Sequence, residues 1–314
     1  MKRSKQVAPP QQEPDALSSW WRVFLTGLVL WIASVVVTGA TSNTNLIPTV
    51  VLLGSFLVPV TAVIWYLNHY HSPILSPRLV LYAFIVGGIL GLLAACLLEA
   101  WMRSDGLLGN VGVGLIEEFV KLVTLIIIAR GLSRYTTRDG IVLGAAVGFG
   151  FAAFESSGYA LNALVTTTQG GEYQLSLYTL LYNELIRGVL APVGHGLWTA
   201  ILGGVLFSAS RGSHLRITGK VVGAYLLVAL LHAVNNSMRG IAIVLTALLT
   251  TTQPPQIPLT LGTLPPPTEE QRSVFLVIEG GWILLISVVG LLVLWRLWRR
   301  SGVGSSTMSY GFDA

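Results

Sequence analysis

The feature that most constrains this chain is a series of long apolar runs, separated by short connectors rich in basic residues, glycine or proline. A helix of about 20 apolar residues spans a hydrocarbon layer about 30 Å thick. Inside that layer a helix satisfies its own backbone hydrogen bonds, which an isolated strand does not. The two-residue alternation typical of a membrane barrel is absent from the runs. The sequence therefore predicts an all-α fold, a polytopic transmembrane helical bundle.

Composition agrees with a membrane protein, because only 11% of the residues are charged, against about 25% in a typical soluble domain. We predict about eight spans, near residues 22–40, 46–67, 79–101, 110–130, 141–163, 190–210, 220–238 and 273–296. Pro192 should break the sixth span from the segment at 175–190. Residues 240–251 either prolong the seventh span or re-enter the membrane. We assign 1–19 to a disordered tail, 20–298 to the transmembrane domain and 299–314 to a flexible tail.

The basic residues predict the orientation of these spans. Most of the 19 Lys and Arg fall in segments that face one side if the N-terminus is cytoplasmic. Because cytoplasmic loops are enriched in Lys and Arg, we expect both termini to be cytoplasmic. The formal charge of +5 is then a topology signal, and no nucleic-acid partner is predicted. The single cysteine, Cys96, lies in an apolar run and is expected to pack there.

Ionisable residues inside spans are costly, so each is a candidate functional residue. The span at 110–130 contains Glu117, Glu118 and Lys121. Glu117 and Lys121 are four residues apart and share a helix face, while Glu118 points about 100° away. One acid can therefore pair with the lysine while the other faces a cavity. A purely structural ion pair is the alternative.

Three more spans contribute Glu155, His195 and His232, the last followed by Asn235 and Asn236. Alone, each histidine would be interpreted as an interhelical hydrogen bond. At about 1.5 Å of rise per residue, however, these side chains and Glu117 lie at similar depths in the outer half of the bilayer. Two imidazoles and several carboxylates in one layer indicate a shared site.

Zinc chemistry fits such a layer. Two histidines and a carboxylate can hold Zn²⁺ and leave a position for water, so we predict Glu155, His195 and His232 as metal ligands. Glu117 or Glu118 would act as general base, and Lys121 would hold its neighbour ionised. Asn235 and Asn236 would orient the substrate or donate to an oxyanion. The H-E-x-x-H motif is absent, so these ligands must converge from separate helices.

At this point the sequence resembles a known family. EEFVK at 117–121, FAAFE at 151–155, GHGLWTA around His195 and LHAVNNS around His232 resemble the motifs of PrsW intramembrane proteases, over about residues 110–240. The resemblance implies a plasma-membrane metalloprotease that cuts membrane-anchored proteins, such as anti-sigma factors. CAAX prenyl proteases are more distantly similar and have a histidine where this chain has Glu155. That difference disfavours CAAX processing and leaves open a glutamate-activated water without metal.

Two other functions remain open at this point. A proton- or cation-coupled transporter would also bury acids and histidines, although no internal repeat is visible. A scaffold that lost its chemistry would have no reason to keep the acids, the lysine and both histidines. Outside the motifs, Glu184 and Arg187 are three residues apart and are expected to form a local salt bridge, with Arg187 also within reach of the acidic site.

Overall fold

A computed structural model describes residues 19–102, 106–167, 171–190, 192–250 and 267–301. The two expected tails lie almost wholly outside these residues. The helices are α1 (Trp20–Thr41), α2 (Ile47–His69), α3 (Pro77–Glu99), α4 (Gly106–Ala129), α5 (Thr137–Leu164), α6 (Leu177–Leu190), α7 (His195–Ala209), α8 (Gly219–Thr250) and α9 (Glu269–Arg300). A 3-10 turn, η1 (Thr44–Leu46), precedes α2, and strands β1 (Val165–Thr167) and β2 (Tyr173–Leu175) form an antiparallel hairpin between α5 and α6.

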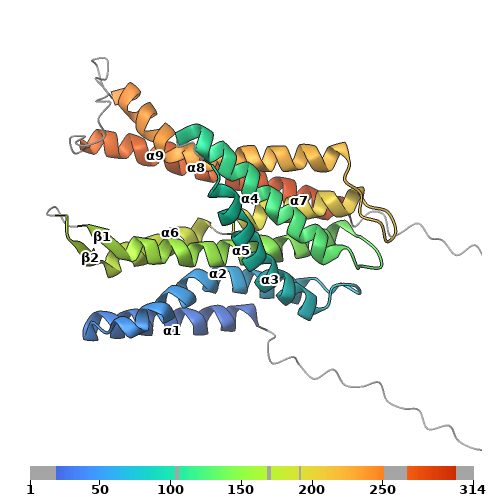
Figure 1. Ribbon diagram of the computed structural model, residues 1–314, viewed down its shortest axis with the longest axis horizontal. Helices are drawn as coiled ribbons and strands as arrows, with labels where there is room; N and C mark the ends of the chain where they lie inside the picture. Colours follow the sequence, from blue (N-terminus) through green and yellow to red (C-terminus); the bar gives the residue numbers. More distant parts are fainter. Residues whose placement is uncertain (1–18, 103–105, 168–170, 191, 251–266, 302–314) are drawn as a thin grey trace, which may run out of the picture.

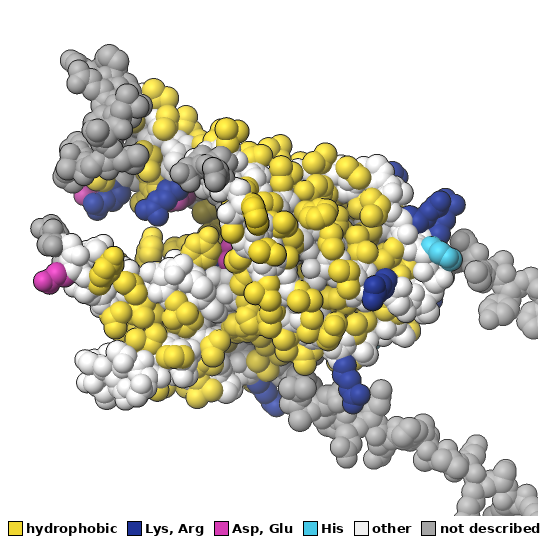
Figure 2. Space-filling model, in the orientation of Figure 1, with side chains coloured by type: hydrophobic (Ala, Val, Ile, Leu, Met, Phe, Trp, Pro, Cys, Tyr) yellow, Lys and Arg dark blue, Asp and Glu magenta, His cyan; other side chains and the backbone are white. Residues whose placement is uncertain are grey.

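Among the described residues, seven segments are long and apolar enough to cross a membrane, with α6 and α7 counted as one segment. The helix α4 has the necessary length but carries Glu117, Glu118 and Lys121; it corresponds to the fourth predicted span, near 110–130, and brings the number of spans to the eight predicted. The prediction of a polytopic helical bundle is therefore confirmed, and the chain is a multi-pass membrane protein. The face of the molecule seen in Figure 2 is covered largely by hydrophobic side chains, as a lipid-facing surface requires.

The centre of the bundle is α5, which lies between α2 and α3 on one side and α7 on the other (Figure 1). In its most apolar stretch 83% of the residues are buried, against 6% in α1 and α9. Glycines make this central position possible, because Gly144 and Gly148 of α5 lie directly against the backbone of α7 at Thr199 and His195. Small residues at such crossings allow two backbones to approach closely.

Two local predictions can be compared with the helix boundaries. The helix is interrupted between Leu190 and His195, where the amides of Val193 and Gly194 donate to the carbonyl of Leu190. The predicted break at Pro192 is therefore confirmed. Residues 240–250 continue α8 as one helix of 32 residues, so the first alternative for this segment is the observed one.

Candidate active site

The centre of the polar cluster is the ammonium group of Lys121, which is completely buried. Its Nζ donates to Glu117 Oε2 at 3.1 Å, to Glu118 Oε1 at 2.9 Å and to His195 Nδ1 at 2.7 Å. These three bonds use all three donors of the ammonium. Two carboxylates around one cation also keep the charge of this buried group partly balanced.

The hydrogen bonds fix the tautomer of each imidazole. Because His195 Nδ1 accepts from Lys121, its ring proton is on Nε2, which lies 3.1 Å from Glu155 Oε2. On α8, His232 Nδ1 lies 2.9 Å from Glu118 Oε1. An ionised carboxylate only accepts, so this nitrogen is the donor and His232 Nε2 keeps its lone pair.

The two unprotonated nitrogens both face Glu117. His195 Nδ1 and His232 Nε2 each lie 3.9 Å from Glu117 Oε2, and the donor atoms of the three residues lie within 4.8 Å of one another. Ligand atoms at about 2.0–2.1 Å from a tetrahedral zinc are about 3.4 Å apart, so each nitrogen has to approach Glu117 by only about half an ångström. The donor atoms therefore fit a metal ion once the Lys121 ammonium, which donates to His195 Nδ1, moves off that nitrogen.

This convergent set differs from the expected one by one residue. Glu117 is the carboxylate that faces both unprotonated imidazole nitrogens, whereas Glu155 contacts the opposite, protonated side of His195. Glu118 likewise contacts the protonated nitrogen, Nδ1, of His232. Each histidine thus has a carboxylate behind it, an arrangement that orients metal-binding imidazoles in many proteins.

Glu155 also forms an ion pair with Arg187 of α6. The expected local salt bridge between Glu184 and Arg187 is therefore wrong. Glu184 instead accepts a hydrogen bond from Trp31 Nε1 at 3.0 Å. The physical reason is the position of α6 between α2 and α5, because each charged side chain is directed into a different interhelical contact.

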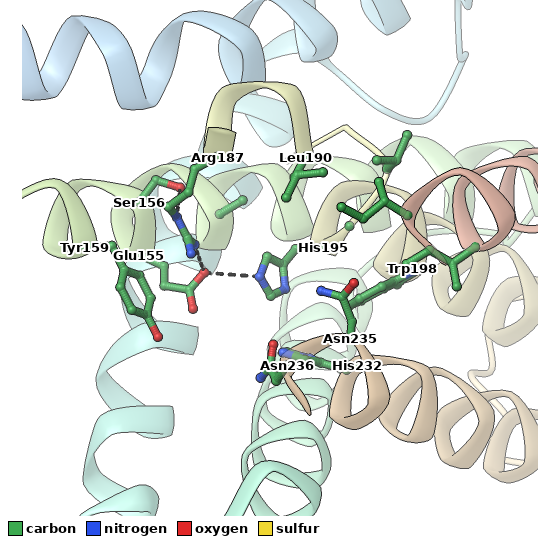
Figure 3. A pocket seen from close by; sticks show the side chains of 15 residues that line it. Glu155, Ser156, Tyr159, Arg187, Leu190, His195, Trp198, His232, Asn235 and Asn236 are labelled. Carbon is green, nitrogen blue, oxygen red and sulfur yellow. Dashed lines mark hydrogen bonds and ion pairs between the residues drawn. The ribbon is translucent and has the colours of Figure 1, made fainter. Parts of the chain in front are cut away.

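A cavity of about 120 Å³ adjoins the cluster, with room for several water molecules. Glu155, His195 and His232 line it, and Asn235 and Asn236 project from α8 into the same space (Figure 3). The walls come from α5, α6, α7, α8 and α9. Figure 2 shows a hollow at the end of the molecule, between the β1–β2 side and the α8–α9 side.

Exposure divides the predicted residues into two groups. Glu118 and Lys121 are fully buried behind the imidazoles, whereas Glu155, His195 and both asparagines line the cavity. Sequence reasoning did not select Tyr159, which also lines the cavity. A signal was available, because Tyr159 is four residues after Glu155 and therefore on the same face of α5.

A family model described as PrsW family intramembrane metalloprotease matches residues 76–262, more than half of the chain. The chain belongs to this family. The matched region contains every residue of the PrsW site described above, while α1 and α2 precede it. No curated protein and no solved structure matches the chain. Membership in the PrsW family implies a membrane-embedded protease, and therefore a hydrolase, with a metal ion and a membrane-protein substrate.

Proposed function

We propose that this protein is an intramembrane endopeptidase that hydrolyses a peptide bond of a membrane-anchored protein in the cavity beside His195. One observation supports the proposal most directly. Two oriented imidazoles and three carboxylates, contributed by α4, α5, α7 and α8, form one cluster, and Glu155, His195 and His232 of this cluster line a cavity inside a membrane bundle. Polar groups that only held helices together would have no need to meet at a cavity.

We propose Glu117, His195 and His232 as the ligands of a zinc ion. Their donor atoms converge, and a histidine pair with one carboxylate is a common catalytic zinc site. When bound, the metal supplies an activated water and polarises the scissile carbonyl. In this assignment Glu118 and Glu155 orient the two imidazoles, and Lys121 holds Glu117 and Glu118 in place.

Glu155 is our candidate for the general base. Its Oε2 is occupied by His195 and Arg187, while its carboxylate faces the cavity (Figure 3), where a water molecule and the substrate would lie. A carboxylate there can take a proton from the attacking water and pass it to the leaving amine. Glu118, by contrast, is fully buried behind His232. The same proton transfer would operate if the water were activated by glutamate alone.

The amide groups of Asn235 and Asn236 are proposed to bind the substrate or the oxyanion. Both line the cavity, one turn beyond His232 on α8. A side-chain amide can donate to negative charge that develops on a carbonyl oxygen during attack.

We propose that cleavage takes place near the extracytoplasmic face of the plasma membrane, with both termini of the chain in the cytoplasm. In this orientation α4 and the combined α6–α7 segment begin, and α5 ends, on the outer side. Glu155 lies in the second half of α5, nearer its outer end, and His195 follows α6 as the first residue of α7. By resemblance to the PrsW family, a membrane-anchored protein such as an anti-sigma factor is the proposed substrate.

A cleavage assay in liposomes tests the proposal. Purified protein is reconstituted with a tagged single-span substrate, and wild type is compared with Glu117→Gln and His195→Ala, with and without a chelator. We expect cleavage by wild type alone, lost in chelator and restored by zinc. Equal cleavage with and without the chelator would support the protease assignment and contradict the zinc assignment. If no sample cleaves while ion flux responds to the variants, the transporter alternative is correct.

A further inference from the structure

Arg187 contacts the polar cluster from α6, a helix that contributes none of the cluster residues discussed above. Its Nη2 forms the ion pair with Glu155 Oε2, and its Nε donates to Ser156 Oγ at 2.8 Å. Its guanidinium carbon lies 4.3 Å from the centre of the Tyr159 ring. Figure 3 shows the side chain reaching down from α6 to these three residues of α5.

The same oxygen of Glu155 serves both sides of the break between α6 and α7. Oε2 accepts from Arg187, near the end of α6, and from His195 Nε2, at the start of α7. A carboxylate held by one donor can rotate about its final torsion, which is soft. Two donors that approach from different helices fix this oxygen in one position.

We infer that Arg187 is a positioning residue for His195 and acts through Glu155. It holds Oε2 where this oxygen accepts the hydrogen bond from His195 Nε2–H, so that the Nδ1 side of the ring faces Lys121 and Glu117. This inference rests on the proposed function of the site, which it extends by a residue outside the predicted motifs. Groups that orient a metal-binding histidine typically change metal affinity or activity by about 10–100-fold when they are replaced.

The geometry favours arginine over lysine at this position. A guanidinium is planar and presents several donors in a fixed arrangement, so it can contact Glu155, Ser156 and the Tyr159 ring together. An ammonium group is a compact charge on a flexible stem. Arg187→Lys should therefore restore part of the effect of Arg187, and Arg187→Gln none of it.

The first test is a double-mutant cycle on zinc affinity, measured in detergent by competition with a chromogenic chelator. Arg187→Gln and Glu155→Gln are each expected to weaken zinc binding by about 10–100-fold. If Arg187 acts through Glu155, the zinc affinity of the double variant equals that of whichever single variant binds zinc more weakly. If the fold-losses in zinc affinity of the two single variants multiply in the double variant, the inference is overturned and Arg187 has a separate role, such as direct contact with substrate.

The second test needs no metal. Protein with ¹⁵N-labelled histidine is reconstituted in nanodiscs, and the His195 signals are assigned with His195→Gln. Wild type should show a protonated Nε2 and an unprotonated Nδ1. Because Lys121 still donates to Nδ1, Arg187→Gln should keep this tautomer but shift the Nε2 signal as the hydrogen bond to Glu155 loosens, and Arg187→Lys should show a smaller shift. An unchanged His195 spectrum in Arg187→Gln would refute the inference.

Ser156→Ala is the matched control, because it removes a contact of Arg187 but leaves the ion pair with Glu155. Its zinc affinity should stay within about threefold of wild type, below the range expected for orienting groups. The wild-type spectrum reports on His195 even if Arg187→Gln does not fold: protonated Nδ1 there would refute the inference. If only the inference about Arg187 fails, wild type still cleaves the substrate and Glu117→Gln still abolishes cleavage. If the proposed function fails, wild type itself does not cleave.

Discussion

Gly88 and Gly150 face each other where α3 crosses α5, and a Cβ atom on Gly88 would lie 2.5 Å from the carbonyl carbon of Gly150. A Cβ on Gly150 would in turn collide with the carbonyl oxygen of Phe84. The two backbones are therefore in direct contact, one helical turn before Glu155. Such contacts stabilise membrane helices, because lipid provides no hydrophobic force between them.

Replacement of Gly150 by alanine should destabilise the protein, because the new methyl group has to separate α3 from α5. We expect a loss of about 1–3 kcal/mol in the free energy of unfolding, as for other overpacked sites. Gly158→Ala is the control, since nothing lies within 4 Å of a Cβ at that position on the same helix. Unfolding in mixed detergent and SDS measures both, and equal stabilities would contradict the close contact.

Metal content should distinguish the two candidate carboxylate ligands. If Glu117 completes the site with His195 and His232, Glu117→Gln should purify without zinc. Glu155→Gln should retain zinc with affinity weaker by about 10–100-fold, as expected for a group behind a ligand. Mass spectrometry of the metal and a competition titration measure the two quantities. Zinc lost from Glu155→Gln and kept by Glu117→Gln would instead support Glu155 as the ligand.

Trp31→Phe should destabilise the contact between α1 and α6, since it removes the indole donor that bonds to the buried carboxyl of Glu184. The expected cost is about 1–3 kcal/mol, the usual penalty for leaving a buried acceptor unpaired. Trp101→Phe is the control, because that side chain is 82% exposed. Thermal unfolding in detergent would show whether the two substitutions differ. Equal unfolding temperatures would argue against this hydrogen bond.

Asn236→Ala should lower kcat with little change in KM if the amide stabilises negative charge in the transition state. Removal of one such donor typically costs about 10²–10³ in kcat. Asn110→Ala is a suitable control, because Asn110 donates to Ser237 Oγ and does not line the cavity. Cleavage rates measured over a range of substrate concentrations separate the two parameters. A rise in KM alone would indicate substrate binding instead.

The spans were predictable because each depends on a single stretch of chain. Apolar length alone predicts a helix such as α3, and Pro192 predicts the break before α7. Depth along each helix was also available, since it follows from residue counts. The acids and histidines were identified as ionisable residues inside spans, and the PrsW motifs added the family to which they belong.

The rotation of each helix about its axis was not predictable. Spacing within one helix gives the faces of Glu117 and Glu118 relative to each other, but not which face meets α7. For this reason the sequence could not decide whether Glu117 or Glu155 faces the unprotonated nitrogens of the two histidines. The same limit explains the wrong pairing of Glu184, whose partner Trp31 is 153 residues away.

The β1–β2 hairpin was also not predicted, although the sequence contains a signal for it. The strand residues Val165–Thr167 are β-branched, and Gly171 between the strands has φ of +82°. Glycine adopts this backbone region without the penalty of other residues. The run is three residues long on each side, and its apolar flanks hid it within the ends of the neighbouring helices.

The buried charges of α4 have a consequence for how the protein is made. The translocon admits each ionised residue at a helix centre at a cost of about 2.5–3.5 kcal/mol, and α4 has Glu117, Glu118 and Lys121. Its partners His195 and His232 are synthesised later, on α7 and α8. Nascent α4 must therefore remain in a hydrated or protein-lined environment until α7 and α8 have been synthesised. Insertion of α4 into the membrane and assembly of the catalytic cluster are then completed together.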